Sequence, residues 1–569
     1  MQRIVIYQLL PRLFGNDNTT RRPGGTKAEN GCGRMDDITR KALKELRAMG
    51  ITHVWPTGFL EHATQTSYAA EGIPDDHPAV VKGMAGSPYA IRDYYDVDPD
   101  LATWVDLRRQ DFRRMLGRIH ACNLKMIMDF VPNHVARHYH SDAAPQGVTD
   151  FGTGDDPSQA FSPQNNYYYI PGVELQPQFD VQGYHEQPAR ATGNNVFHAF
   201  PTRNDWYETV KLNYGVDYVA GCTTHFSPTP NTWYKMRDIL LFWAKEGVDG
   251  FRCDMAEMVP VEFWEWVIPQ IKAFRPGIIF IAEVYNPSLY RDFIHRGAFD
   301  YLYDKVGLYD TLRAVVCGQA SAQAITNCWQ SVDDIRSHML NFLENHDEQR
   351  LASDFFAGNG RRGRPALIVS ALLYTNPFMC YFGQELGERG MDAEGFSRRD
   401  GRTTIFDYWC VDSIRRWRNK DAFDGTLLTE EELELKEFYR RTLTLCNDNE
   451  VLREGDSFDL MYANPHLHRQ YAFVRQWNGL CILIIANFSD SEERVTVTLP
   501  THFFDHYGIA PREKATFYNL YGATKQRLPF KPEHPMEFVV PANYGAAFQV
   551  KCKASPPAPL RGEGGHKGA

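Results

Sequence analysis

Short apolar segments recur along the first two-thirds of the chain, and they constrain the fold more than any other feature of the sequence. Eight of them occur, at residues 4–7, 52–55, 125–130, 250–253, 278–282, 299–302, 340–343 and 379–382. Such segments are typical of parallel strands that are buried on both faces. Amphipathic helical patterns lie between several of them, at residues 108–121, 236–245 and 261–274. This alternation, repeated eight times, predicts an α/β fold, a (β/α)8 TIM barrel.

The spacing of acidic residues after these segments predicts an insertion. Asp254 and Glu283 are 29 residues apart, which is one strand–helix unit, whereas Asp129 and Asp254 are 125 residues apart. The second interval exceeds a unit of about 30 residues by roughly 90. We therefore expect an inserted, loop-rich subdomain at residues 135–224 after the third strand, in a barrel formed by residues 1–134 and 225–449. A second long loop, at residues 59–97, follows the second strand.

The pattern changes after a predicted helix at residues 433–446. Apolar, β-rich segments separated by turn residues follow, at residues 471–477, 481–487, 494–499 and 537–540. They predict a C-terminal antiparallel β-sandwich at residues 450–553. The polar, Pro- and Gly-rich residues 554–569 predict a disordered tail.

Composition excludes several classes of partner. The net charge of −10 gives the chain no overall attraction to nucleic acid or to an anionic membrane. Eleven cysteines without a CxxC pair indicate reduced thiols rather than a zinc site or a disulfide scaffold. The sequence shows neither a signal peptide nor a membrane span, so we expect a cytoplasmic protein. The sequence does not predict its oligomeric state.

Four segments carry acidic or imidazole side chains directly after apolar strands. They are residues 129–134, 250–254, 281–284 and 345–347. A single acid at a strand end is as often a helix cap as a catalyst. Three carboxylates, one arginine and two histidines are costly to gather at one rim, because like charges repel. Since catalytic groups of a barrel lie at the carboxyl ends of its strands, the set predicts an active site there.

In order and spacing, these four segments resemble the conserved regions of the α-amylase family, glycoside hydrolase family 13. Residues 6–12, 87–95, 210–213 and 381–385 add to the resemblance, which covers most of residues 1–450. The resemblance implies the same three-part architecture. Residues 210–213 look closer to the neopullulanase-like and branching members than to typical α-amylases.

The resemblance implies a role for each of three carboxylates. Asp254 would be the nucleophile, Glu283 the general acid/base, and Asp347 the third carboxylate, which binds the sugar and stabilises the transition state. Cleaving an acetal requires a proton on the leaving oxygen and negative charge beside an oxocarbenium-like centre. Glu283 must therefore start protonated, which partial burial and the two neighbouring carboxylates would favour.

The resemblance also implies residues that bind or orient the sugar. Arg252 would keep Asp254 ionised, because an adjacent cation favours the charged carboxylate. Tyr89 would stack on the sugar at the cleaved position, and His134 and His346 would donate hydrogen bonds to its hydroxyls.

The chemistry itself requires no cofactor, but the family shares a calcium site. Asn133 matches one of its ligands, and the others cannot be placed in this sequence. Because calcium needs six to eight oxygen ligands, a structural calcium ion remains an open expectation.

These residues predict a retaining glycoside hydrolase that cleaves α-1,4 bonds in α-glucans or maltooligosaccharides through a covalent glycosyl-enzyme intermediate. An α-glucan transglycosylase, a glucanotransferase, would use the same residues and is the alternative. A binding protein that had lost activity is disfavoured, because all three carboxylates are present. Glu257 and Met258 stand where many α-amylases of the family have Lys-His, which disfavours ordinary endo-acting starch hydrolysis.

Three other clusters are interpreted as structural. They are a potential metal-binding group at residues 138–142, a basic loop at residues 361–364 and an aromatic run at residues 167–169. A solvated loop, an exposed loop before a helix, and packing within the insertion explain them at least as well.

Overall fold

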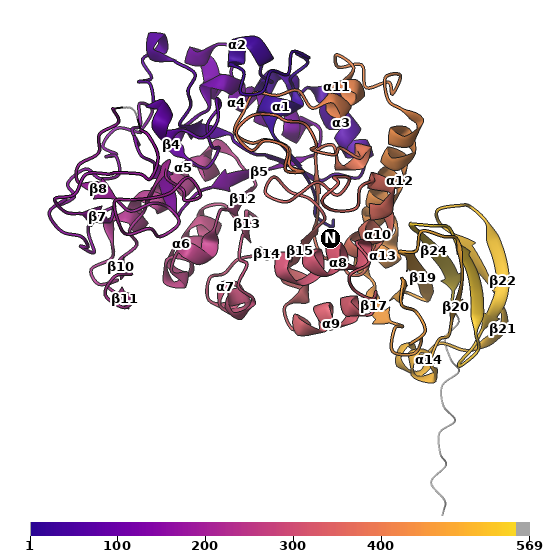
Figure 1. Cartoon of the computed structure of the whole chain (residues 1–569). Coiled ribbons are helices and arrows are strands. Elements are labelled where there is room, and N and C mark those ends of the chain that lie inside the picture. The colour runs from indigo at the N-terminus through magenta and orange to yellow at the C-terminus, as the bar shows by residue number, and fades with distance from the viewer. Residues whose placement is uncertain (1, 182, 553–569) are drawn as a thin grey trace, which may run out of the picture.

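Eight parallel strands form a closed barrel in the computed structural model, which describes residues 2–181 and 183–552 (Figure 1). The strands follow one another around the barrel in chain order. They are β1 (Val5–Leu9), β2 (His53–Pro56), β5 (Lys125–Phe130), β12 (Gly250–Cys253), β13 (Ile279–Ala282), β14 (Tyr301–Tyr303), β15 (Met339–Phe342) and β16 (Phe378–Tyr381). Each of the eight predicted segments overlaps one of these strands, so the predicted TIM barrel is confirmed.

Helices surround the barrel and bury one face against it. The helices of the barrel and its loops are α1 (Pro11–Phe14), α2 (Lys27–Asn30), α3 (Arg40–Ala48), α4 (Arg108–Ala121), α5 (Asn231–Glu246), α6 (Val261–Phe274), α7 (Tyr290–His295), α8 (Asp310–Val316), α9 (Ala324–Ser331), α10 (Arg364–Leu372), α11 (Asp412–Arg418) and α12 (Glu430–Asp448). In α6, Phe263, Trp264 and Val267 are fully buried. Their three- and four-residue spacing places them on one side of the helix, as the apolar periodicity predicts.

The predicted loop after the second strand contains regular structure. Strands β3 (Leu60–His62) and β4 (Ile91–Val97) pair antiparallel and are buried throughout. The prediction of a plain loop was therefore incomplete. The buried hairpin places the residues just before β4, including Tyr89, against the barrel.

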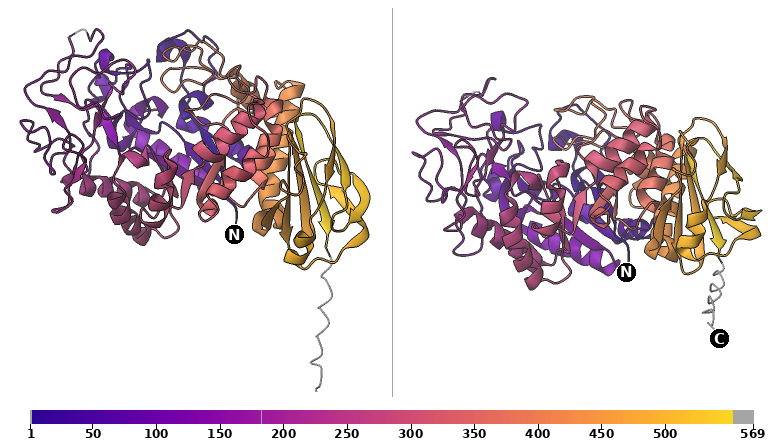
Figure 2. Two further views of the ribbon diagram at one scale, coloured as in Figure 1. Left: turned by 60° about the horizontal axis from the view of Figure 1, so that its bottom comes forward. Right: turned by 90° about the horizontal axis from the view of Figure 1, so that it is seen from below.

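A long segment between β5 and α5 forms a separate lobe beside the barrel, drawn in purple in Figures 1 and 2. It contains small antiparallel pairs rather than one sheet, namely β6 (His134–Ala136) with β9 (Thr209–Lys211), β7 (Tyr169–Ile170) with β8 (Ala189–Arg190), and β10 (Val216–Asp217) with β11 (Thr223–Thr224). The segment lies where the insertion was predicted. The boundaries 135–224 stay a prediction.

Antiparallel sheets occupy the other end of the molecule (Figure 2). After α13 (Glu450–Glu454), the order of the larger sheet is β17 (Asp456–Asp459), β18 (Gln470–Trp477), β19 (Leu480–Asn487), β24 (Tyr544–Lys551), β21 (Arg512–Asn519) and β22 (Lys525–Phe530). Strands β20 (Glu493–Val497) and β23 (Met536–Val540) form a second sheet, and the Phe538 ring contacts Phe548 of the larger one with centroids 4.6 Å apart. The C-terminal antiparallel architecture is thus confirmed, whereas helix α14 (Thr501–Tyr507) was not predicted.

Two further outcomes concern the ends of the sequence and its cysteines. The predicted disordered tail at residues 554–569 lies outside the described residues. All eleven cysteines are free thiols in the structure, and the sulfur atoms of Cys481 and Cys552 are 2.9 Å apart.

A buried carboxylate anchors the inserted lobe. Glu186 is 2.7 Å from Arg137 Nη1 and 2.8 Å from Arg190 Nη2. Burial alone would raise the pKa of Glu186, but the two guanidinium groups outweigh it and lower the pKa from 4.5 to about 2. A carboxylate whose pKa is lower in the folded protein stabilises the fold above its unfolded pKa, and this stabilisation is lost as the pH falls.

We expect Glu186→Gln to lower the free energy of unfolding by about 3 kcal/mol at neutral pH, since each pKa unit corresponds to about 1.4 kcal/mol. The difference between wild type and variant should shrink as the pH falls from about 4.5 towards about 2. Denaturant unfolding at several pH values measures it. Glu174→Gln, at an exposed ion pair of the same lobe, is the control and should change stability little at any pH. A constant difference for Glu186→Gln across this pH range would contradict the assignment.

Candidate active site

The register of three neighbouring strands brings the predicted site residues together. Arg252 on β12 lies beside Asp129 on β5 and beside Ile281 on β13. Asp254 and Glu283 directly follow β12 and β13. Because the strands are parallel, these side chains, together with Asp347 after β15, emerge at the same end of the barrel.

The buried guanidinium of Arg252 lies at the centre of the site and pairs with three carboxylates. Arg252 Nη1 donates to Asp254 Oδ1 at 2.9 Å and to Asp129 Oδ1 at 3.2 Å. Its Nη2 is 2.7 Å from Glu283 Oε2, in an ion pair. The rings of Trp55, Tyr89 and Tyr303 surround the guanidinium at 5.3, 5.4 and 5.6 Å from their centroids. The side chain of Arg252 is fully buried, so water does not weaken these ion pairs.

The electrostatic environment shifts the pKa values of Asp254 and Asp347 in opposite directions. Burial raises the pKa of Asp254, and nearby Glu283 and Asp347 raise it further, against the opposing effect of Arg252. For Asp347, desolvation would raise the pKa, but His346, Arg252 and other nearby cations lower it to about 2. Asp347 is therefore ionised at neutral pH, whereas at Asp254 the opposing effect of Arg252 does not cancel the rise in pKa that burial and the neighbouring acids cause.

Tyr89 and His346 form a stacked pair beside Asp347. Their ring centroids are 5.1 Å apart with an interplanar angle of 23°, and Tyr89 Oη is 2.5 Å from His346 Nε2. The same ring nitrogen is 3.0 Å from Asp347 Oδ2, and Gln8 Nε2 contacts the other at 2.8 Å. These contacts hold the ring of Tyr89 in one position, and Tyr89 lines the active-site cavity. His346 is 3% exposed and lies behind that ring.

His134 begins the inserted segment and remains neutral. Burial lowers its pKa to about 3, with additional effects of Lys211 and Lys82. Its ring packs against Trp206 with centroids 5.2 Å apart. A neutral imidazole both donates and accepts hydrogen bonds, which suits recognition of sugar hydroxyls.

A cavity of about 530 Å³ opens over these groups. All three predicted catalytic carboxylates line it, as do Tyr89 and His134. Arg252 and His346 support the cavity from behind, because they are 0% and 3% exposed and are not among its lining residues. The remaining lining residues are Lys82, Ser87, Trp206, Glu208, Thr209, Met255, Tyr285, Lys305, Val306, Glu348 and Phe406.

Sequence reasoning did not foresee the hydrogen-bond partners of Glu283. Tyr285 donates through Oη to Glu283 Oε1 at 2.5 Å, and the backbone N–H of Met255 donates to Glu283 Oε2 at 2.8 Å. Glu257, noted only as a departure from the family, accepts hydrogen bonds from the backbone N–H groups of Tyr285 and Asn286 at 3.0 and 2.9 Å. It therefore holds the loop that carries Tyr285. The sequence did contain a signal for Tyr285. Residues two apart in an extended segment point to the same face, so Tyr285 follows Glu283 at a spacing that places the two side chains together.

The surroundings of Asn133 decide how well a calcium ion would fit there. Its side-chain oxygen accepts a hydrogen bond from Lys211 Nζ, which also donates to Met258 O at 3.2 Å. Its amide nitrogen contacts Gly193 O and the ring of His134. Burial lowers the pKa of Lys211 to about 7. As arranged, these residues fit a buried lysine better than a calcium ion, which needs six to eight oxygen ligands. The proposed reaction involves no metal.

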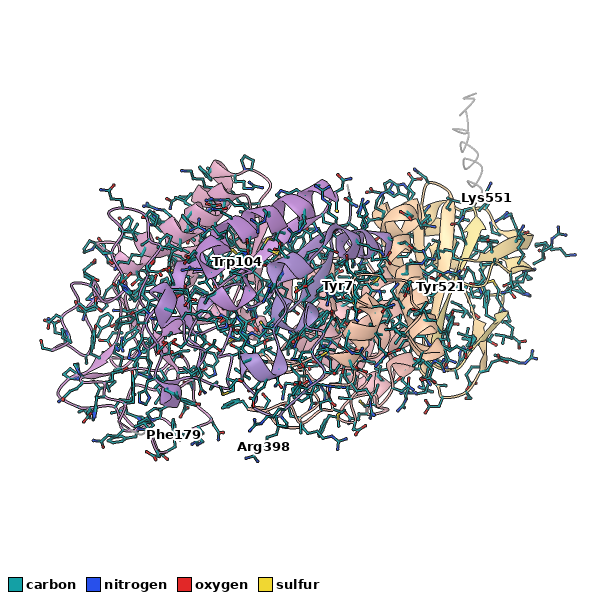
Figure 3. The ribbon with its side chains drawn as sticks, turned by 90° about the horizontal axis from the view of Figure 1, so that it is seen from above. Tyr7, Trp104, Phe179, Arg398, Tyr521 and Lys551 are labelled. Carbon is teal, nitrogen blue, oxygen red and sulfur yellow. The ribbon has the colours of Figure 1, made fainter. Side chains whose placement is uncertain are left out.

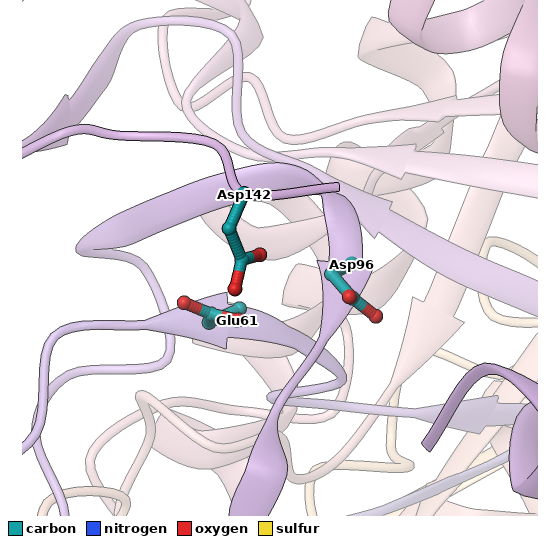
Figure 4. A group of neighbouring side chains, drawn as sticks. All are labelled: Glu61, Asp96 and Asp142. Atoms are coloured by element: carbon teal, nitrogen blue, oxygen red, sulfur yellow. The ribbon is translucent and has the colours of Figure 1, made fainter. Parts of the chain in front are cut away.

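Within the described residues, one group of acids is close enough to hold a metal. The carboxylates of Glu61, Asp96 and Asp142 lie within 4.8 Å of one another (Figure 4). Arg108 Nη2 is 3.6, 3.0 and 3.5 Å from them, respectively. The Arg108 guanidinium therefore already places a positive charge beside the three carboxylates, where a metal ion would otherwise supply it.

The three clusters interpreted as structural have structural partners. His140 Nδ1 is 2.7 Å from Asp150 on the surface. In the basic loop, Arg361 and Arg364 both pair with Glu434 of α12. In the aromatic run, Tyr167 and Tyr168 are buried within the insertion. The first two clusters therefore have ion-pair partners at the surface, and the third packs within the insertion.

Comparison with known proteins identifies the family. The model of the α-amylase catalytic domain matches residues 8–422. The chain belongs to the α-amylase family. It is an α-amylase-type glycoside hydrolase, as the resemblance predicted. Among the described residues, none of the helices has the length and apolar composition needed to cross a bilayer.

Several family members are similar along most of the chain. A cyclomaltodextrinase of Thermoanaerobacter pseudethanolicus is 22% identical over 504 residues, which is 86% of this chain and 71% of the relative. Neopullulanase 2 of Thermoactinomyces vulgaris is 22% identical over 519 residues, 87% of this chain and 71% of the relative. A solved maltogenic α-amylase of Thermotoga neapolitana has a TM-score of 0.62 at 19% identity, covering 96% of this chain and 98% of its own.

We expect Tyr285→Phe to lower kcat on an α-glucan substrate by about tenfold, because it removes the hydrogen bond that Tyr285 donates to Glu283. Its ring should still pack, so the melting temperature should change little. Tyr234→Phe, at an exposed tyrosine of α5, is the matched control and should keep wild-type kcat. Unchanged kcat in Tyr285→Phe would show that the contact with Glu283 does not support catalysis.

Proposed function

We propose that the protein is a retaining hydrolase of α-1,4-glucosidic bonds in α-glucans or maltooligosaccharides. One observation carries the proposal: a single buried guanidinium pairs with Asp254 and Glu283 beneath a cavity that Asp347 also lines. Double displacement requires two carboxyl groups close together at the cleaved bond and charge stabilisation beside it, and these three side chains meet at one cavity.

In the first step, the Asp254 carboxylate attacks the anomeric carbon while protonated Glu283 gives its proton to the glycosidic oxygen. The bond between that carbon and oxygen breaks, and the leaving sugar departs as a neutral alcohol. A covalent ester of Asp254 remains, and Glu283 is then a carboxylate. Positive charge develops on the sugar ring in the transition state, and the ionised Asp347 stabilises it.

In the second step, the Glu283 carboxylate takes a proton from water, whose oxygen attacks the same carbon and releases Asp254. Two inversions at one carbon retain its configuration. A sugar hydroxyl in place of water would give transfer, the alternative reaction of the same residues.

Product analysis separates these outcomes. The protein is incubated with maltoheptaose, pullulan or isomaltooligosaccharides, and the products are resolved by chromatography. We expect shorter maltooligosaccharides from maltoheptaose and little turnover of isomaltooligosaccharides. Products longer than maltoheptaose would favour the transferase, and cleavage of pullulan a neopullulanase-like specificity. No turnover of any α-glucan would overturn the substrate class.

Two isosteric variants test the roles of the carboxylates. Glu283→Gln should lower kcat on maltoheptaose by about 10²–10⁴-fold, the usual contribution of general acid catalysis. It should still release fluoride from α-maltosyl fluoride in the first step, because fluoride leaves without being protonated. Asp254→Asn should lose activity on both substrates, because the nucleophile itself is gone.

The fluoride substrate supplies the internal control for this pair. Equal losses of Glu283→Gln on both substrates would contradict its role as general acid. Substantial activity of Asp254→Asn on α-maltosyl fluoride would contradict its role as nucleophile. Circular dichroism and melting temperatures check that both variants are folded.

A further inference from the structure

A second cavity lies next to the active-site cavity. It has a volume of about 560 Å³, and its lining includes Phe179, Tyr207 and Phe396. It is formed by the segment between β3 and β4, the inserted segment and the loop after β16, and Figure 3 shows Phe179 and Arg398 of the last two regions at the same edge of the molecule. Aromatic rings in a cavity beside a sugar site are suited to stacking on further sugar units.

Three short segments separate the two cavities, and we refer to them together as the partition. They are residues 81–83, 207–208 and 406–407. On each segment, neighbouring residues face opposite sides. Lys82, Glu208 and Phe406 line the active-site cavity, whereas Val81, Gly83, Tyr207 and Asp407 line the second one.

The backbone of the partition is fixed by close contacts. Gly83 has φ +67, and a Cβ atom there would lie 2.3 Å from Phe406 O, so a side chain would not fit. Next to it, Ala85 N donates to Phe406 O at 2.9 Å and Met84 N donates to Asp407 Oδ1 at 3.2 Å. The two segments thus approach as closely as glycine permits, and side chains close the remaining gap.

An ion pair provides that closure. Lys82 Nζ is 2.9 Å from Glu208 Oε1, and the two side chains are 11% and 4% exposed. The ammonium also lies 5.3 Å from the ring centroid of Tyr207, on the side of the second cavity. A buried charge pair of this kind is held in one geometry, because separating it would leave two unpaired charges in a poorly solvated place.

We propose that the paired side chains of Lys82 and Glu208 determine specificity by filling the gap that closes the glucan site at this end, so that the enzyme accepts a chain end there and not the middle of a chain. This inference rests on the proposed function. A closed end admits a terminal glucosyl unit but excludes a polymer that continues past it. Truncating the pair would connect the two cavities and let the chain extend over Phe179 and Tyr207.

Two double variants test the proposal. Lys82→Ala with Glu208→Ala removes the side chains that close the gap, whereas Lys82→Met with Glu208→Gln keeps their size and removes only the charges. Neither leaves an unpaired buried charge, which protects folding. The substrates are linear maltoheptaose and β-cyclodextrin, a ring of the same seven glucosyl units without a chain end. Melting temperatures confirm that both variants are folded.

We expect the wild type to release one dominant product length first from maltoheptaose and to use the ring poorly. The alanine pair should raise the ratio of kcat/KM on β-cyclodextrin to that on maltoheptaose by about tenfold and should give mixed product lengths. The size-matched pair should keep the wild-type product pattern. Efficient wild-type cleavage of the ring, or an unchanged ratio in the alanine pair, would overturn the proposal.

The same experiment separates the proposal from the function on which it rests. If the wild type does not cleave maltoheptaose, the proposed function fails and the partition proposal fails with it. If the wild type cleaves maltoheptaose and the alanine pair behaves identically, only the role of the Lys82–Glu208 pair is refuted.

Discussion

The active site depends on one positive charge buried among four carboxylates. Arg252 contacts Asp254, Asp129 and Glu283 directly, and Asp347 lies close enough to be affected by it. Without the guanidinium, these acids would repel one another at the barrel rim and take up protons. The barrel makes the arrangement possible, because parallel strands in register place Arg252 beside Asp129 and just before Asp254.

The loops around this centre divide two tasks. Tyr285 and Glu257 belong to the loops after β13 and β12: Tyr285 donates a hydrogen bond to Glu283, and Glu257 accepts one from the backbone of Tyr285. The inserted lobe and the loops after β3 and β16 instead shape the cavity, through Trp206, the partition and its Lys82–Glu208 pair. The cavity wall is therefore assembled from several parts of the chain, and Tyr285 belongs both to this wall and to the hydrogen bonds around Glu283.

Much of the fold was predictable because its signals are local. The β12 segment and helices α4 and α6 occur at the predicted residues, since apolar runs and amphipathic periodicity directly reflect burial on both faces or on one. The β3–β4 hairpin was missed. Its strand β4 is buried although its sequence, IRDYYDV, is rich in charge. Partners of those charges come from other segments, as when Asp93 accepts a hydrogen bond from the backbone N–H of Asp142 in the insertion. Helix α14 was missed in a region dominated by β-patterns.

By itself, the sequence determined the repeat of strands and helices, the position of the insertion and the acids at the strand ends. Each follows from the order of residue types along the chain, and parallel strands oblige their carboxyl ends to meet. Only the tertiary structure decided which charges pair. That Lys211 lies against Asn133, that Glu257 binds a neighbouring loop and that Lys82 meets Glu208 depend on contacts across 78, 28 and 126 residues. Partners so far apart leave no periodic signal, because chain packing rather than local pattern brings them together.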